Sequence, residues 1–504
     1  MNSKNMHMGV NTHINKVSDG NAQFECVRDC VDFLVCHTDP HRETLEKSIE
    51  SNKKSRDLLE SAGIDYIINF EFQNFIYDPK CPDGTKWSLN TGEIHRLAIP
   101  EKYMSFLSEG SHFRGIEYDE LEHAIINENL SIKLSSKGKI KKPVFPLSDS
   151  ADPLAQGKLL ENQLREYADE IKKSGAEIFI GEHVFPVLFH TFARTGITPN
   201  FKSQKESVSN IQFATAAGAA LEYGTPLWNC VDCWFRNTNP GHSADEMYNN
   251  LVFAYYAGVN NVYVESTSVF TDGEKPNEYA EKFRQFSEEY RGKGRDYDIH
   301  DYLPEIGIIR YDDTYWGQGD PFVWKNMLFG NKKIKPDGRS KEYIKIFSML
   351  THGETPKGSF SWDKVSPHSL SRHRSFVTLN STAVFDDRVT EETLKSLKLC
   401  FLSGIFISEE TLKAVENLVK ENGLTVVTPK RFAPAHILKK AEAKYNEITD
   451  GKGLWIVTDD IAGKRVKKKI KPFLGNKNEI RLTFENREVI MKISPDGNGI
   501  SIIN

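Results

Sequence analysis

One pattern repeats through residues 1–315: a short apolar stretch ends on an acid or a polar cluster, and a helical stretch follows. The apolar stretches lie at residues 7–13, 32–39, 66–74, 112–118, 177–185, 226–234, 260–267 and 305–312. Eight strands that alternate with helices predict an α/β fold of the (β/α)8, or TIM, barrel type. Side chains at the carboxyl ends of barrel strands line the active site, so we expect the acids that end these stretches to lie together.

The chain has 504 residues, which is too long for one ordinary core, so we expect more than one domain. We predict the barrel at residues 1–335, a small open α/β domain at 336–465 and a small antiparallel β-domain at 466–504. Strands at 397–407, 423–429 and 453–459 around a helix at 408–422 predict the second domain. Alternating apolar residues at 481–484 and 489–493 predict the third.

The net charge of −5 creates no strong field for nucleic acid or an anionic membrane, and no run approaches the roughly 18 apolar residues of a membrane span. Seven cysteines without framework spacing favour a reducing compartment. The polar start predicts no signal peptide, so we expect a cytoplasmic protein or a secreted one given without its leader. Cys230 and Cys233 form a lone C-x-x-C, and there is no Gly-rich phosphate loop, so we predict no metal or cofactor.

Glu265 is the leading candidate for a catalytic carboxylate. Strand side chains alternate, so Tyr263 and Glu265 share one face and Val262 and Val264 the other. We expect the tyrosine and the acid to face the barrel centre. The alternative is a buried acid that an arginine pairs for stability, because an unpaired carboxylate there is costly.

The stretch at 112–118 runs into Asp119 and Glu120, and we choose Glu120 as the general acid with Asp119 beside it. A general acid must hold its proton near neutral pH, which burial or a second carboxylate achieves. The alternative is that these acids cap the following helix. Glu182 is a rival acid, and His183 beside it is a candidate substrate-binding residue or part of a rim pair.

Polar and aromatic residues at the strand ends are candidates for sugar binding. Tryptophan and tyrosine rings stack on apolar sugar faces, although such rings more often belong to a core. The predicted binding residues are Asn69, Glu71, His183, Trp228, Asp232, Trp234, Tyr263 and Trp316.

Acids at barrel strand ends, without a metal or nucleotide motif, favour glycoside hydrolysis, which needs two carboxylates. We therefore predict a glycosidase that cleaves an oligosaccharide or polysaccharide, in which Glu120 is the acid/base and Glu265 the nucleophile of a retaining mechanism. The sugar, the linkage and the choice between retention and inversion stay open. A non-catalytic carbohydrate-binding barrel is a further alternative.

The segments Cys400 to Leu412 and Val426 to Pro429 resemble the middle, glutaminase-like domain of the family-42 β-galactosidases. The resemblance implies a barrel, a trimerisation domain and a small β-domain in that order, and a homotrimer. In that clan the acid/base ends strand four after an Asn, and the nucleophile ends strand seven. By our strand count Glu120 and Glu265 match these strands, but Asp119 stands where the clan has Asn.

The Asp119–Glu120 pair also resembles the pair at the end of strand four in barrel hexosaminidases. This resemblance implies substrate-assisted cleavage of an N-acetylated sugar, in which Glu120 is the acid and Asp119 orients the acetamido group. Glu265 would then only bind substrate.

Overall fold

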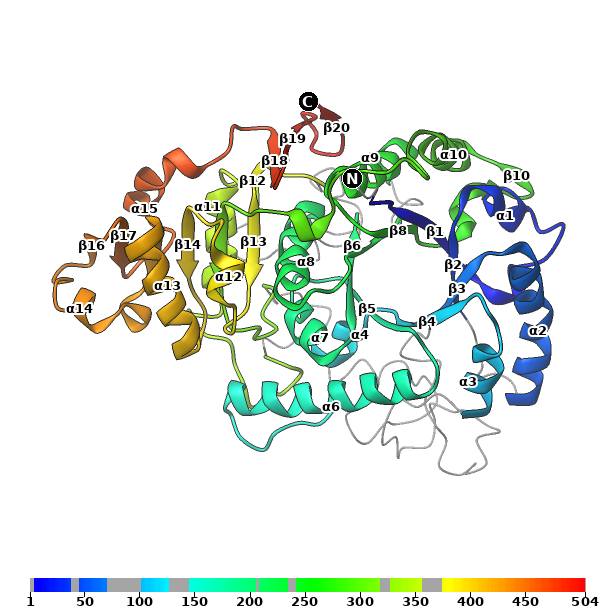
Figure 1. Cartoon of the computed structure of the whole chain (residues 1–504), viewed down its shortest axis with the longest axis horizontal. Helices are drawn as coiled ribbons and strands as arrows, with labels where there is room; N and C mark the ends of the chain where they lie inside the picture. The colour runs from blue at the N-terminus through cyan, green and yellow to red at the C-terminus, as the bar shows by residue number, and fades with distance from the viewer. Residues whose placement is uncertain are drawn as a thin grey trace.

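The computed structural model describes residues 4–37, 45–69, 101–126, 145–204, 208–233, 242–317, 327–355 and 374–503. Eight parallel strands close into a barrel, in which each strand pairs with the next along the chain and the last pairs with the first (Figure 1). The strands are β1 (His7–His13), β2 (Phe33–His37), β3 (Asp65–Asn69), β4 (Phe113–Tyr118), β5 (Ile178–His183), β6 (Thr198–Ser203), β7 (Trp228–Val231) and β8 (Asn261–Val264). The predicted barrel is thus confirmed.

One of the predicted barrel strands is wrong. The stretch at 305–312 holds β11 (Ile306–Ile309), which pairs with β13 (Thr382–Phe385) and β14 (Leu399–Leu402) in a second sheet. The strand that completes the barrel is β6, with the sequence Thr-Pro-Asn-Phe-Lys-Ser. Proline cannot donate to a ladder and every second residue here is polar, so β6 does not read as a buried strand. The stretches at 226–234 and 260–267 are therefore the seventh and eighth strands.

The barrel interior holds a small apolar cluster separate from the larger core. Its members are Phe33, Val35, Ile67, Ile180, Trp228, Cys230 and Tyr263. Val262 and Val264 point the other way and pack in the larger core. This confirms the predicted faces of β8, because Tyr263 lies inside the barrel while its two valine neighbours lie outside.

Helices surround the barrel on its outer side. Their bounds are α1 (Ala22–Glu25), α2 (Leu45–Ala62), α3 (Glu101–Ser108), α4 (Leu121–Ile126), α6 (Pro153–Lys173), α7 (Phe189–Thr195), α8 (Ser209–Tyr223), α9 (Ala244–Tyr256) and α10 (Glu278–Tyr290). The side chain of Ser243 caps α9 by accepting from the Glu246 N–H, as its sequence predicts.

A six-stranded sheet in the order β13-β11-β14-β15-β17-β16 lies beside the barrel (Figure 1). Its further strands are β15 (Thr425–Thr428), β17 (Gly453–Thr458) and β16 (Tyr445–Asp450), and only the β16–β17 pair is antiparallel. Helices α11 (Glu342–Leu350), α12 (Glu391–Leu394), α13 (Glu409–Asn422), α14 (Ala435–Leu438) and α15 (Lys464–Lys469) accompany it. Gly423 ends α13 with φ of 79°, which fits the expected C-cap.

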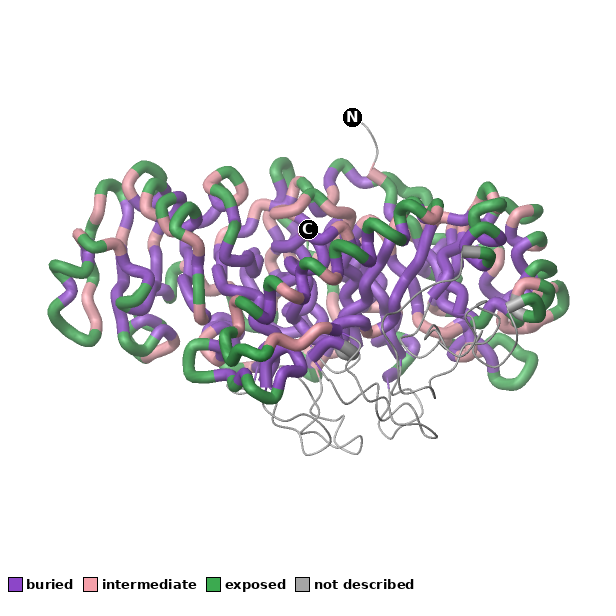
Figure 2. The backbone as a smooth tube through the Cα atoms, turned by 90° about the horizontal axis from the view of Figure 1, so that it is seen from below, coloured by how far each residue is buried: buried purple, intermediate pink, exposed green. Residues whose placement is uncertain are grey.

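A third sheet joins β12 (Leu379–Asn380), β18 (Glu479–Phe484), β19 (Arg487–Ile493) and β20 (Ile500–Ile502). The antiparallel strands predicted near the C-terminus are confirmed in β18 and β19, while β12 pairs parallel to β18. Buried backbone runs through the strands, and exposed segments gather at the turns (Figure 2). Among the described residues, no helix is long and apolar enough to cross a membrane.

Candidate active site

The side chain of Lys202 enters the barrel from β6 and meets five carboxyl groups at the carboxyl ends of the strands. Its exposed fraction is 1%. The distances from Lys202 Nζ to the nearest oxygens are 2.9 Å for Glu265, 3.0 Å for Glu182, 3.2 Å for Asp119, 3.3 Å for Glu120 and 3.4 Å for Asp232. Four strand ends, those of β4, β5, β7 and β8, thus converge on the cation that β6 supplies.

One ammonium cannot neutralise five ionised carboxylates, so their protonation states diverge. Burial opposes the charge on Lys202, but the surrounding acids outweigh it and raise its pKa well above the usual value. Burial and the neighbouring Asp119 raise the pKa of Glu182 well above its usual range. Burial acts against ionisation of Asp119 too, yet Lys202 and a hydrogen bond with Glu182 lower its pKa. These shifts favour the charged form of Lys202, the protonated form of Glu182 and the ionised form of Asp119.

A second polar layer lies deeper in the barrel. The Tyr263 hydroxyl is 2.6 Å from Glu117 Oε1 and 2.7 Å from Glu182 Oε1, and Asn200 Nδ2 donates to Glu117 at 2.8 Å. Burial, which is the largest effect, raises the pKa of Glu117 to about 7. This layer holds the buried end of Glu182 in place.

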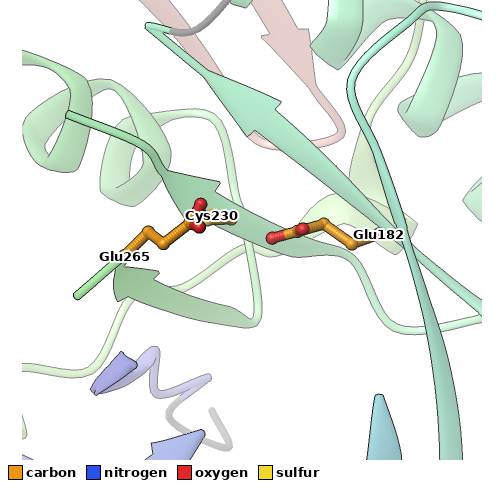
Figure 3. A group of neighbouring side chains, drawn as sticks. All are labelled: Glu182, Cys230 and Glu265. Atoms are coloured by element: carbon orange, nitrogen blue, oxygen red, sulfur yellow. Dashed lines mark hydrogen bonds between the residues drawn. The ribbon is translucent and has the colours of Figure 1, made fainter. Parts of the chain in front are cut away.

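Glu182, Cys230 and Glu265 are close enough for their ligand atoms to lie within 4.8 Å of one another, a spacing that suits a metal ion. Figure 3 shows the two carboxylates turned toward each other beside Cys230. However, Lys202 Nζ already lies within 3.0 Å of an oxygen of each carboxylate. Burial also raises the pKa of the Cys230 thiol, which disfavours the thiolate that a metal would bind. The Lys202 ammonium group thus supplies the positive charge that a metal ion would bring to these carboxylates.

A pocket of about 520 Å³ opens beside the cluster. Asp232 and Glu265 line it, and so do Asn11, His13 and His37 from β1 and β2. Asn11 Nδ2 and His37 Nε2 are 2.8 Å apart. Within the cluster, Glu120 and Glu265 expose the most side-chain surface, with exposed fractions of 25% and 15%.

Backbone strain gathers around the same site. Glu120, Gln204 and Ser266 follow β4, β6 and β8, and all three have positive φ, at 50°, 72° and 70°. Such conformations cost free energy for residues other than glycine and often mark functional sites. These residues turn the backbone at the ends of the strands, close to the acids of the cluster.

Six of the predicted site residues meet in this cluster or in the layer below it. They are Asp119, Glu120, Glu182, Asp232, Tyr263 and Glu265. The helix-capping alternative fits Asp119 and Glu120 less well, because both contact Lys202. Glu122 has another role, since its Oε1 accepts the backbone N–H groups of Val184 and Phe185.

Other predicted binding residues lie in cores. His183 stacks on Phe189 at 3.9 Å, and burial lowers its pKa to about 3. Trp316 is 1% exposed and stacks on Phe185, with 3.9 Å between the ring centroids.

Trp228 packs edge-on to Phe33 inside the barrel, at 5.3 Å between the ring centroids. Asn69 is buried at the end of β3. Glu71 and Trp234 lie outside the described residues.

The strand count changes one part of the family-42 resemblance. Glu265 follows β8, whereas the acid that follows β7 is Asp232. The match of Glu265 to a nucleophile at the end of strand seven is therefore wrong.

Lys202, Asn200 and Glu117 are the site residues that sequence reasoning missed. Lys202 and Asn200 belong to the strand that was not recognised. A usable signal was the alternation of Thr198, Asn200 and Lys202 with apolar residues just before a long Ala-rich helix.

No family model and no curated protein sequence matches the chain. Solved structures share the barrel at low similarity, glycoside hydrolases among them. GH5_18 from Streptomyces cattleya, in complex with GlcNAc, has a TM-score of 0.39 and 11% identity over 61% of this chain and 85% of its own. A β-mannanase from the blue mussel Mytilus edulis has a TM-score of 0.34 and 9% identity, over 58% of this chain and 94% of its own. A mutant tryptophan synthase α-subunit from Pyrococcus furiosus has a TM-score of 0.31 and 10% identity, over 57% of this chain and 99% of its own. Similarity at this level describes the fold alone.

Proposed function

We propose that the protein is a retaining glycoside hydrolase that acts on an oligosaccharide or polysaccharide. The observation that carries this proposal is the convergence of five carboxyl groups on Lys202 beside an open pocket. Glycoside hydrolysis requires one protonated and one ionised carboxyl group. In this cluster the pKa of Glu182 is raised and that of Asp119 is lowered, so the surroundings favour both forms side by side.

Glu265 is the nucleophile in this proposal and Glu120 the acid/base. A catalytic carboxylate must touch the sugar, and these two are the most exposed acids of the cluster. The nearest oxygens of Glu120 and Glu265 lie 3.3 and 2.9 Å from the same nitrogen atom, so the two oxygens are separated by no more than these two distances together. This closeness favours the about 5–5.5 Å of retaining enzymes over the about 6.5–9.5 Å of inverting ones.

Lys202 and Glu182 support that pair. The ammonium 2.9 Å from Glu265 favours the ionised nucleophile, and its charge orients the carboxylate. The raised pKa of Glu182 favours its protonated form close to the same groups, but only 1% of its side chain is exposed. We therefore assign Glu182 to proton storage beside Asp119, with direct acid catalysis as its alternative role.

A hydrolysis screen over aryl glycosides and neutral oligosaccharides tests the proposal. With the substrate identified, we expect Glu265→Gln and Glu120→Gln to lower kcat/KM by several orders of magnitude. A 2-deoxy-2-fluoro glycoside of the same sugar should label Glu265, and peptide mass spectrometry locates the label. Turnover that survives Glu265→Gln would rule this residue out as the nucleophile.

Asp232 is the competing nucleophile. The family-42 resemblance, with the corrected strand count, implies that role for the carboxylate after β7, and Asp232 lines the pocket. The fluoro-sugar label on Asp232 would move the mechanism to this residue. The same resemblance implies a trimer, and light scattering of the purified protein measures the oligomeric state.

Substrate-assisted cleavage is the second candidate, and the lowered pKa of Asp119, which lies next to Glu120, favours it. This mechanism predicts activity on N-acetylated sugars only, a strong loss of activity in Asp119→Asn and no covalent label on the protein. Sugar binding without turnover, unchanged by neutralising any of these acids, would instead support the non-catalytic barrel.

A further inference from the structure

The carboxyl edge of the six-stranded sheet carries a second pocket, away from the acid cluster. The chain goes from β11 to β13 on one side and then crosses to β14 on the other. Such a reversal leaves a crevice beyond the carboxyl ends of the strands, where α/β sheets bind ligands. A pocket of about 470 Å³ lies there.

Three strand ends and one barrel helix build this pocket. Tyr311 follows β11, Asp387 follows β13 and Phe406 follows β14. Lys158 and Leu154, at the start of α6, line the pocket from the barrel side. In Figure 1, α6 spans the lower edge of the view from the barrel to the sheet.

Asp387 brings an unsatisfied acceptor to the pocket. It is 2% exposed, and its Oδ1 receives no hydrogen bond from the described part of the chain. Burial and the adjacent Asp386 raise the pKa of Asp387 to about 7. A buried carboxyl oxygen without a donor is unfavourable, so a hydroxyl group from a ligand would complete it once the carboxyl group turns toward the pocket.

Phe406 offers an apolar surface beside this acceptor. It is a large apolar side chain with 37% exposure, and its ring lies edge-on to Tyr311 at 6.3 Å between centroids. Exposed aromatic rings beside polar groups suit ligands that have one apolar face.

The cations at the rim do not create an anion site. Arg388 Nη2 lies 3.0 Å from Glu161 Oε2, and Lys158 Nζ lies 3.9 Å from Glu161 Oε1. Glu410 adds another acid to the lining. The cations that line the pocket thus already contact an acid, which favours a ligand without a negative charge.

We propose that this pocket binds an uncharged sugar ring, with Phe406 against its apolar face and Asp387 accepting one of its hydroxyl groups. The site would hold a carbohydrate chain without cleaving it. It goes beyond the proposed function, because it shares no residue with the barrel cluster and does not require hydrolysis.

Calorimetric titration and saturation-transfer NMR test the site on the full chain. The background is the Glu120→Gln, Glu265→Gln variant, so that substrates are not consumed. The probes are neutral β-linked hexasaccharides of glucose, mannose, galactose and N-acetylglucosamine. We expect binding of at least one probe, weakened about tenfold or more by Phe406→Ala and also weakened by Asp387→Asn. Leu438→Ala is the matched control, since Leu438 is 39% exposed in α14, and it should leave the affinity unchanged.

Three results would overturn the inference. The first is that no probe binds. The second is that Phe406→Ala binds the probes as tightly as the variant without this change. The third is that inorganic phosphate competes with the probe, and that Phe406→Ala abolishes this competition. Failure of the barrel proposal is distinct: hydrolysis of a small aryl glycoside depends on Glu265 and not on Phe406. Phe406→Ala should therefore hydrolyse that substrate at the wild-type rate.

Discussion

Lys202 is buried among carboxyl groups, and its charge stabilises those that remain ionised. Removing one partner of a buried ionic network leaves uncompensated charge, which is strongly destabilising. The cluster therefore couples protein stability to the protonation of the acids.

We expect Lys202→Met to lower the free energy of unfolding by about 3–5 kcal/mol. The loss should be larger at pH 8 than at pH 5, because more of the acids are ionised at pH 8 and the variant lacks the positive charge of Lys202 that stabilises them. Urea denaturation at both pH values measures this. Lys398→Met is the control, since Lys398 is 60% exposed and pairs with Glu305 at 2.6 Å. Its loss should stay below about 1 kcal/mol.

Glu117 provides a pH test of the deeper layer. Its pKa is raised from 4.5 to about 7, so the folded state retains a proton that the unfolded chain has released. Stability from this group is present below pH 4.5 and is lost as the pH rises through about 7.

Glu117→Gln removes this titration. The unfolding free energy of the variant relative to wild type should thus rise between pH 5 and 8, by on the order of 2–3 kcal/mol. Urea denaturation at pH 5, 6, 7 and 8 gives the difference. A difference that stays constant across this range would show that Glu117 has an ordinary pKa.

At the scale of elements, α8 is one of the contacts between the barrel and the six-stranded sheet. It packs on β6 and on β13 and is rich in small residues. A Cβ on Gly218 would lie only 1.6 Å from the backbone oxygen of Val384. Glycine at this position allows the helix and the strand to approach closely.

We expect Gly218→Ala to destabilise the protein by about 3 kcal/mol, because a backbone atom cannot move aside as a side chain can. Gly338→Ala is the matched control, since nothing lies within 4 Å of its added Cβ. Thermal unfolding compares the two variants. Equal melting temperatures would mean that α8 and β13 separate easily.

At the scale of the whole molecule, a buried network joins the barrel to the second sheet. Arg194 in α7 is 6% exposed and lies 2.7 Å from Asp386, which follows β13, and 3.2 Å from Glu161 in α6. The ionic contacts and the α8 packing together predict that the barrel and the sheet unfold as one unit.

Arg194→Met should lower the melting temperature and separate the calorimetric transition into two, because Asp386 and Glu161 lose their shared partner. Arg339→Met is the control, since Arg339 is 50% exposed and contacts Asp337 nearby in the chain. A single transition at the wild-type temperature in Arg194→Met would show that the network does not couple the two parts.

The sequence by itself determined the barrel, most of its strands and the acids at their ends. Apolar periodicity and strand-end chemistry are local properties, and they located Asp119, Glu120, Glu182, Asp232 and Glu265. The inward position of Tyr263 followed from alternation alone.

Only the tertiary structure decided which strand closes the barrel and which cation the acids share. β6 is polar because its inner face meets the acids of other strands, so its pattern makes sense only when the barrel is closed. β11, by contrast, is as apolar as a barrel strand and yet pairs with β13 and β14. Whether an aromatic ring binds or packs was decided in the same way, because Trp228 and Trp316 are buried by residues distant in sequence. Burial and pairing depend on contacts between distant segments, which local patterns do not encode.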